Sequence, residues 1–371
     1  MKKTLIAVAA LSAMAASAMA ANVTLYGKLD QGIQVQKTKL TGDESKTTFK
    51  GTSGISSGSR WGLKGTEQIA DGYTVGFVLE SGFDGMDGKS GQGSRLFGRD
   101  AFMTLGTPFG SLTVGRTGML SDGCTGDIIA GQSSPFGTTY GIAAATANTF
   151  GDILGGRTDR AVRYVSPKFA GVQLHAEYAN MNGGDKQPNK QRYGGVGVSY
   201  ANGPLYVAVA AETLRMSAEQ EAHYAQLNDP RFFSLAANYN FGVAKVFAGY
   251  QYAKHTPVSA SVDGIVVKNK SKFGDVAGRT FYGKYNAGTL GVSAPIGGGI
   301  LMASVAYRKG TDDATDVDVT WTTGAIGYKY NLSKRTYLYT DVAYGKEKWE
   351  QTTGDKSGKV TQFNLGLCHN F

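Results

Sequence analysis

Apolar and polar residues alternate with a period of two in many segments of this chain. The clearest case is the final stretch, TQFNLGLCHNF, in which Phe363, Leu365, Leu367, His369 and Phe371 share one phase and small or polar residues occupy the other. A β-strand points successive side chains to opposite faces of its sheet. The stretch therefore predicts a strand with one apolar and one polar face that continues to the last residue.

Segments of the same kind recur along the chain, and their connections alternate between short turns and long polar stretches. We expect sixteen strands, seven short turns and eight long connections, which together form an antiparallel meander. The long connections include residues 36–57 and the longest one, residues 119–156. The predicted strands are 22–35, 59–69, 73–83, 97–106, 111–118, 157–166, 172–180, 193–200, 205–214, 232–240, 243–253, 279–294, 300–310, 319–330, 336–345 and 360–371.

The composition agrees with an all-β fold. The 371 residues include 53 Gly, 20 Tyr and 17 Phe but only 8 Pro, and aromatic and β-branched residues separated by glycine-containing turns are typical of β proteins. No Pro- or Ser-rich linker divides the chain, so we expect one large sheet and not several sandwiches. Beyond the first twenty residues, no segment reaches the roughly 18 uninterrupted apolar residues of a membrane-spanning helix.

Residues 1–20, MKKTLIAVAALSAMAASAMA, contain two lysines, an apolar core and a small-residue end. This pattern predicts a secretory signal that is removed after Ala20 and leaves residues 21–371 as one domain. A membrane anchor is the alternative interpretation, but the apolar core is too short to span a bilayer. Loss of Lys2 and Lys3 would lower the formal net charge from +9 to +7.

A secreted chain with this rhythm of connections is expected to form an outer-membrane β-barrel with lipid outside and a polar interior. The last strand would pair with the first, and Phe371 would lie at the membrane interface, where aromatic residues gather. A soluble sandwich built of hairpins has the same period of two. The regular alternation of connections and the terminal aromatic residue favour the barrel.

Several motifs carry a resemblance to a known family over residues 21–371. They are NVTLYGKLDQGI, SRWGLKGTEQIADGYTVGFVLESGF, GRDAFMTLGTPFGSLTVGR, RAVRYVSPKFAG, NFGVAKVFAGYQYAK and NLSKRTYLYTDVAYG. In this order they resemble the Gram-negative general porins of the β-proteobacterial branch. The resemblance implies a homotrimer of 16-stranded antiparallel barrels in the outer membrane, each a water-filled pore whose third long loop, about 119–156, folds inward. The implied partners are outer-membrane lipid and lipopolysaccharide, ions and small hydrophilic solutes, with no nucleic acid and no cofactor.

Charged residues on the inward phase are expected to set the preference of such a pore. Trp61 and Leu63 share the lipid-facing phase, which turns Arg60 and Lys64 inward. The motifs SRWGLKG and GRDAF, and the arginine ten residues before Pro167, also match the basic wall of family members at Arg60, Arg99 and Arg157. The predicted pore-lining basic residues are Lys28, Arg60, Lys64, Arg99, Arg157 and Arg163, and the predicted acidic residues of the inward loop are Asp122, Asp127 and Asp152. Because basic residues outnumber acidic ones, a weak preference for anions is expected.

Other chemistry is sparse. The four histidines lack metal-ligand spacing, and no phosphate-binding loop, nucleophile elbow or HExxH motif is present. A disulfide between Cys124 and Cys368 is possible in the oxidising periplasm if the Cα atoms approach within roughly 7 Å, and two free thiols are the alternative. The remaining alternatives are a substrate-specific porin, with Tyr140 or Phe150 stacking on solute, an outer-membrane barrel enzyme, and an adhesin with a plugged interior.

Overall fold

The structure is a computed structural model, which describes residues 23–371 apart from 123, 145–149, 151–155, 181–191, 216–228, 258–281, 314 and 351–353. The predicted signal at residues 1–20 and the predicted loop acid Asp152 lie outside the described residues. The strands are β1 (Thr24–Leu40), β2 (Lys46–Ser53), β3 (Arg60–Ala70), β4 (Tyr73–Gly82), β5 (Asp100–Thr107), β6 (Gly110–Gly118), β7 (Arg157–Val165), β8 (Val172–Asn180), β9 (Arg192–Asn202), β10 (Leu205–Arg215), β11 (Arg231–Asn240), β12 (Lys245–Pro257), β13 (Tyr282–Ile296), β14 (Gly299–Asp312), β15 (Asp318–Asn331), β16 (Thr336–Glu350) and β17 (Lys356–Asn370).

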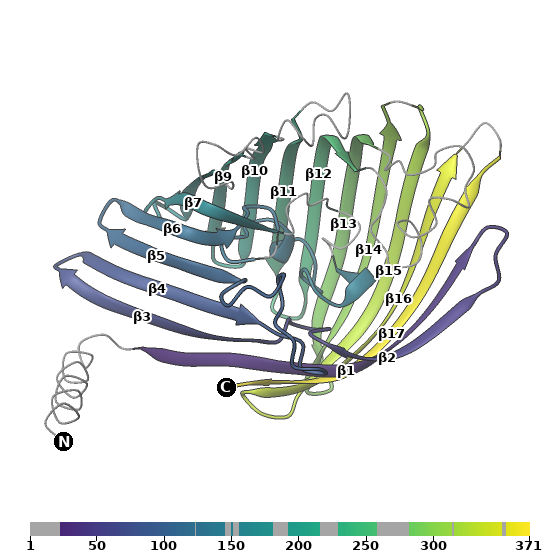
Figure 1. The fold of residues 1–371 in the computed structure, drawn as a ribbon, viewed down its shortest axis with the longest axis horizontal. Helices are drawn as coiled ribbons and strands as arrows, with labels where there is room; N and C mark the ends of the chain where they lie inside the picture. Colours follow the sequence, from purple (N-terminus) through teal and green to yellow (C-terminus); the bar gives the residue numbers. More distant parts are fainter. Residues whose placement is uncertain are drawn as a thin grey trace, which may run out of the picture.

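All these strands belong to one antiparallel sheet that closes on itself (Figure 1). β1 pairs with β17 from Lys28 opposite Asn370 to Leu40 opposite Gly358. At the very end, the N–H of Gly27 donates to the carbonyl of Phe371, and the N–H of Phe371 donates back to Gly27, both at 3.0 Å. The prediction that the last strand seals against the first is thus confirmed. No helix in the described part of the chain is long and apolar enough to cross a membrane.

β2 and β3 are two pieces of one barrel strand. β2 pairs with β1 over Gln31–Thr38, and β3 pairs with the same side of β1 over Thr24–Lys28. Counting the two pieces as one gives the predicted closed 16-stranded barrel. Between them, residues 54–59 leave the ladder, and we refer to this segment as the strand break.

The prediction of a long connection over residues 36–57 is wrong. β1 continues to Leu40 and β2 begins at Lys46, so the loop between them covers only residues 41–45. The polar residues of this region form a hairpin whose side chains are mostly exposed, as in the pattern of β2. Polar composition suggested a loop, but exposure on both faces also permits a polar strand.

The alternation of faces follows the predicted period. On β17, Phe363, Leu365 and Leu367 are exposed on the outer face, whereas Asn364 and Cys368 are buried toward the interior. Exposed apolar side chains of this kind recur on the outer face of the other strands. The outside of the barrel is therefore the apolar surface that a lipid bilayer requires.

The segment that follows β6 folds into the barrel, as expected for the third long loop (Figure 1). Its short helix η1 (Ala130–Gln132) contacts β11 and β12, and its short helix η2 (Gly141–Ala143) contacts β15 and β16. The loop starts and ends on β6 and β7, so these contacts carry it across the interior. We call the described residues 119–144, 150 and 156, without Gly123, the inner loop.

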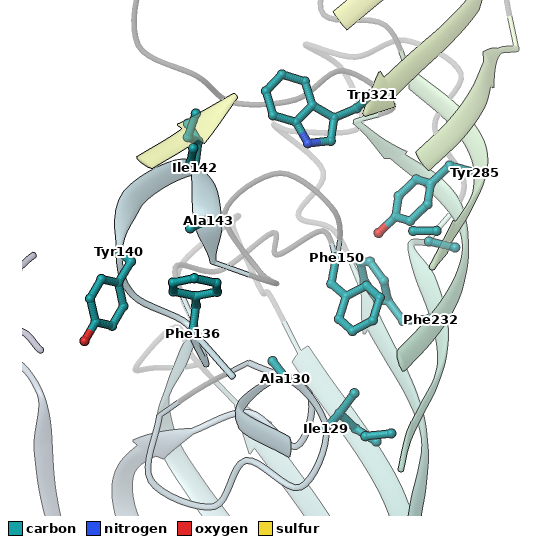
Figure 2. Close-up of a cluster of buried hydrophobic side chains, with 14 of the residues drawn as sticks. Ile129, Ala130, Phe136, Tyr140, Ile142, Ala143, Phe150, Phe232, Tyr285 and Trp321 are labelled. Atoms are coloured by element: carbon teal, nitrogen blue, oxygen red, sulfur yellow. The ribbon is translucent and has the colours of Figure 1, made fainter. Parts of the chain in front are cut away.

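Apolar side chains attach the inner loop to the barrel wall (Figure 2). Ile129, Phe136 and Phe150 are fully buried in one cluster with wall residues. The wall carries glycine where the loop packs against it, which leaves space for the aromatic rings. A Cβ atom on Gly249 would lie 2.8 Å from Phe150, and one on Gly327 would lie 2.8 Å from Phe136. Dense packing of this kind fixes the loop in one position.

Candidate functional site

A cavity of about 700 Å³ lies between the inner loop and the wall of β3–β7. Three parts of the chain enclose it: the strand break, the inner loop, and the inward side chains of the adjacent wall. Its lining residues are Gly54, Ser57, Gly58, Arg60, Glu80, Arg99, Asp122, Cys124, Thr125, Gly131, Gly137, Thr138, Thr139 and Arg157. Three of the six predicted basic residues thus come together at one place.

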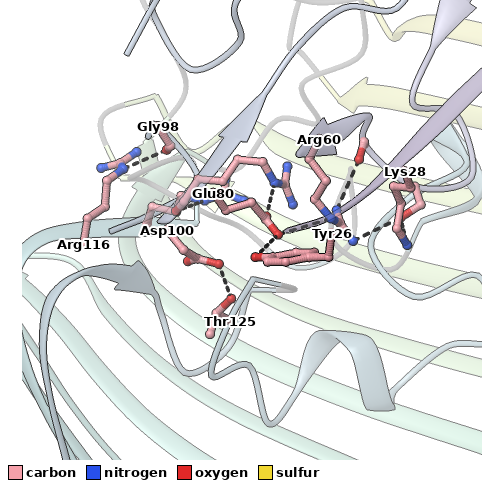
Figure 3. Close-up of polar contacts among 12 residues, drawn as sticks. Tyr26, Lys28, Arg60, Glu80, Gly98, Asp100, Arg116 and Thr125 are labelled. Atoms are coloured by element: carbon pink, nitrogen blue, oxygen red, sulfur yellow. Dashed lines mark hydrogen bonds and ion pairs between the residues drawn. The ribbon is translucent and has the colours of Figure 1, made fainter. Parts of the chain in front are cut away.

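The basic wall of the cavity is organised around a single carboxylate, Glu80 of β4 (Figure 3). Arg99 places its Nε 2.5 Å from one oxygen of Glu80, and Arg60 places its Nε 3.5 Å from the other. Tyr26 donates a hydrogen bond of 3.0 Å to that second oxygen. Arg157 donates from Nε to the carbonyl of Arg99 at 2.9 Å. Glu80 therefore positions two guanidinium groups while leaving an excess of positive charge.

Lys28 and Lys64 lie on the inner face beside this wall, but neither lines the cavity. Lys28 pairs with Arg60 in the β1–β3 register, and its Nζ donates to Ser57 Oγ at 3.1 Å. Lys64 lies on the same face four residues beyond Arg60 on β3, with its Nζ 5.1 Å from the centre of the Tyr26 ring, and it is exposed. Lys28 thus adds charge next to the cavity, and Lys64 adds it further away.

Arg163 is the predicted pore-lining residue whose position differs. It is only 5% exposed and forms a buried ion pair with Glu177, with Nε 2.8 Å from Oε2. Its remaining nitrogens donate to the carbonyls of Thr125 and Gly118. The inner loop turns over this part of β7 and covers the side chain, so Arg163 anchors the loop and does not face the cavity.

The acids of the inner loop have different roles. Asp122 lines the cavity. Asp127 accepts hydrogen bonds from the amides of Ile129, Ala130 and Gly131, so its carboxylate holds the first turn of η1. A third carboxylate, Asp100 of β5, accepts a hydrogen bond of 2.5 Å from Thr125 Oγ1 of the loop (Figure 3). Only one predicted loop acid therefore faces the cavity among the residues described.

Cys124 and Cys368 are both free, so the disulfide considered from the sequence is absent. Cys124 lines the cavity, whereas Cys368 lies buried on β17. Burial raises the pKa of the Cys124 thiol to about 12, and the neighbouring Arg157 opposes this shift. The thiol is therefore neutral over the ordinary range of pH.

The most important residue missed by sequence reasoning is Glu80. Its inward direction follows from its pairing with Gly62, because Gly62 also lies opposite the inward Tyr26. The available signal was a single acid at an inward position of segment 73–83, which has no other charged residue. Among the described residues, no group of three or more His, Cys, Asp or Glu is arranged to hold a metal ion.

Comparisons with known proteins agree with the family resemblance of the sequence motifs. The family model described as Gram-negative porin matches residues 7–349. An outer membrane porin protein of Bordetella pertussis is 32% identical, with all of both chains aligned. Outer membrane porin protein 32 of Delftia acidovorans is 31% identical over 95% of this chain and 92% of its own length. The solved structure of an anion-selective porin from Comamonas acidovorans aligns with 95% of this chain and 100% of its own, at a TM-score of 0.64 and 25% identity.

Proposed function

This chain belongs to the Gram-negative porin family, and from that premise we propose that it is a general diffusion porin with a weak preference for anions. It is an outer-membrane porin and not an enzyme, because its relatives are channel proteins. The family assignment also sets aside the adhesin alternative. We propose in addition the range of solutes that pass, the sign of the ion selectivity and the number of chains in the assembly.

The observation that carries the anion preference is the charge around the cavity. Arg60, Arg99 and Arg157 face Glu80 and Asp122, and Lys28 lies directly beside them. The four basic residues exceed the two acids by about two positive charges around the cavity. Because this excess of charge is small, it supports a weak preference for anions and not a strict one. The solved relative described as an anion-selective porin is consistent with the same sign.

A general channel fits better than a substrate-specific one because the two aromatic residues proposed as stacking surfaces are unavailable. Tyr140 and Phe150 are buried in the packing between the inner loop and the wall. Burial also raises the pKa of the Tyr140 phenol, which remains neutral. Blocking of the ion current by added sugars or organic anions would contradict a general channel.

We propose that three copies assemble as a homotrimer, surrounded by outer-membrane lipid and lipopolysaccharide. Support comes from the family resemblance and from the exposed apolar side chains on the outer face of β1, β5 and β17. Light scattering of the detergent-solubilised protein, corrected for bound detergent, should give three times the chain mass. A monomer mass would contradict this part of the proposal.

The selectivity is tested by the zero-current potential of reconstituted channels in a potassium chloride gradient. The wild type should show an anion preference, which R157Q should reduce by about two- to threefold in permeability ratio. That estimate follows from the removal of one unit charge in a water-filled channel, where two charges about 4 Å apart interact by about 1 kcal/mol and more distant charges by less. K64Q removes an equal charge away from the cavity and should change the ratio less. A cation preference in the wild type would overturn the proposal.

A further inference from the structure

The strand break forms a second wall of the cavity. Gly54, Ser57 and Gly58 line one side of it, and Thr138 and Thr139 of the inner loop line another. The break departs from the ladder at Gly54, whose φ of +75° suits glycine. A Cβ at this position would also approach the backbone of Gly58 at 2.9 Å. The narrow part of the interior is therefore bounded by two inward segments and not by the loop alone.

Hydrogen bonds join the break to the inner loop. The amide of Tyr140 donates to the carbonyl of Ile55 at 2.6 Å, and Thr139 Oγ1 donates to the carbonyl of Ser56 at 2.5 Å. Ser56 Oγ also lies 2.8 Å from the hydroxyl of Tyr337 on β16. The break is thereby attached both to the loop that faces it and to the wall behind it.

One carboxylate organises the break. Asp30 of β1 is fully buried, and its Oδ2 accepts hydrogen bonds from the amides of Ser56 at 2.8 Å and Ser57 at 2.6 Å. Its Oδ1 accepts from the hydroxyl of Tyr339 at 2.5 Å. The Asp30 amide donates to Ser59 Oγ at 3.0 Å, and its carbonyl accepts from the amide of Gly54 at 2.9 Å. Both ends and the middle of the break are thus tied to a single residue.

The break in turn holds the basic side chains. Lys28 Nζ donates to Ser57 Oγ at 3.1 Å, and Arg60 donates from one terminal nitrogen to the carbonyl of Gly58 at 3.2 Å. The other terminal nitrogen of Arg60 lies 3.5 Å from Ser57 Oγ. A displacement of Ser57 and Gly58 would therefore move two of the charges that face or flank the cavity.

We propose that Asp30 is a positioning residue for ion selectivity, which acts by holding the strand break as a platform for Lys28 and Arg60. The inference rests on the proposed function, since it concerns the charges assigned there. Loss of the acceptor at residue 30 releases the strand break, so that the charged groups of Lys28 and Arg60 move away from the cavity. The current through the open channel then becomes less uniform.

The test compares D30A, D30N and D341A in planar bilayers. Asp341 is a suitable control because it is an inward, buried carboxyl group whose side-chain hydrogen bonds, among the described residues, come from Asn364 and not from the break. Asn at position 30 can offer its oxygen to the two amides and its NH₂ to Tyr339, so D30N should retain the platform. We expect D30A alone to lower the anion-to-cation permeability ratio by about twofold, an effect of the size of one displaced charge, and to increase open-channel current noise.

The alternative is a simple effect of charge. In that case D30A would raise the anion preference, as D30N would, and this result would overturn the proposal. S57A provides a second test that alters no charge and leaves the amide of residue 57 on Asp30. It should lower the permeability ratio, and a wild-type ratio in S57A would overturn the proposal even if D30A did not fold. The sign of the wild-type potential tests the proposed function separately, because the inference concerns differences between variants.

Discussion

The buried ion pair between Arg163 and Glu177 makes the attachment of the inner loop accessible to a quantitative test. R163M removes a guanidinium that contacts Glu177 and the carbonyls of Gly118 and Thr125. Glu177 is 4% exposed, and Thr158 Oγ1 would be its remaining described donor, at 2.6 Å. Leaving one member of a buried pair unpaired costs about 3–5 kcal/mol.

A double variant separates the ion pair from the loop contacts. R163M/E177L removes both charges, so the penalty of an unpaired buried carboxylate disappears. The carbonyl of Gly118 at the end of β6 and that of Thr125 in the inner loop still lose the Arg163 donor, although Thr125 keeps those of the Gly118 amide and Thr117 Oγ1. This loss corresponds to about 1–3 kcal/mol. We therefore expect the free energy of unfolding to rank wild type first, the double variant second and R163M last.

Urea unfolding of the folded protein in lipid vesicles, followed by tryptophan fluorescence, measures this ranking. K168M is a suitable control, because Lys168 is an exposed basic residue in the turn that follows β7, and a surface change of this kind costs within about 0.5 kcal/mol. Single-channel records should also show more frequent closures in R163M, since the root of the inner loop is released. Wild-type stability in R163M, or a double variant no more stable than R163M, would refute the assignment of Arg163 as an anchor.

Three further predictions concern the cavity and the seam of the barrel. E80Q should raise the anion-to-cation permeability ratio by about two- to threefold because it removes a cavity acid, and a shift toward cations would contradict the charge argument. The rate at which a maleimide labels Cys124 should rise about tenfold per pH unit from about pH 8 to pH 10, since the raised pKa of about 12 keeps the thiolate scarce. A plateau in that rate near pH 9, measured by mass spectrometry, would show an ordinary thiol. Deletion of Phe371 removes two hydrogen bonds to Gly27 and should lower the free energy of unfolding by about 1–3 kcal/mol, whereas an unchanged urea midpoint would contradict this.

The wall of the barrel could be predicted because its pattern is local. Once Leu25 and Leu63 are assigned to the outer face, the period of two places Lys28 and Arg60 inside without knowledge of any distant residue. The structure has the same arrangement, with Leu25 opposite Leu63 and Lys28 opposite Arg60. The closure by β17 follows in the same way from its alternation.

The contents of the barrel could not be predicted in this way, because the period states which side chains point inward and not what covers them. Arg163 and Arg60 both point inward, yet the inner loop buries one and leaves the other beside a cavity. That difference depends on contacts between residues far apart in sequence, such as those of Thr125 with Arg163 and of Asp100 with Thr125. Any inward charge in a barrel of this size therefore has two possible roles, and the path of the loop decides between them.

The strand break shows the same principle at shorter range. Its sequence, Gly-Ile-Ser-Ser-Gly-Ser, reads as an ordinary polar connection, and in isolation it would be one. Its conformation depends on Asp30, a residue of the neighbouring strand that appears on the sequence as one more inward charge beside Lys28. A carboxylate with several amide donors is used as a structural ligand and not as a free charge. Inward acids of this chain should therefore be assigned to selectivity only after their backbone donors have been counted. By that criterion Asp30 and Asp127 are structural ligands, whereas Glu80, which contacts the side chains of Tyr26, Arg60 and Arg99, contributes to the field at the cavity.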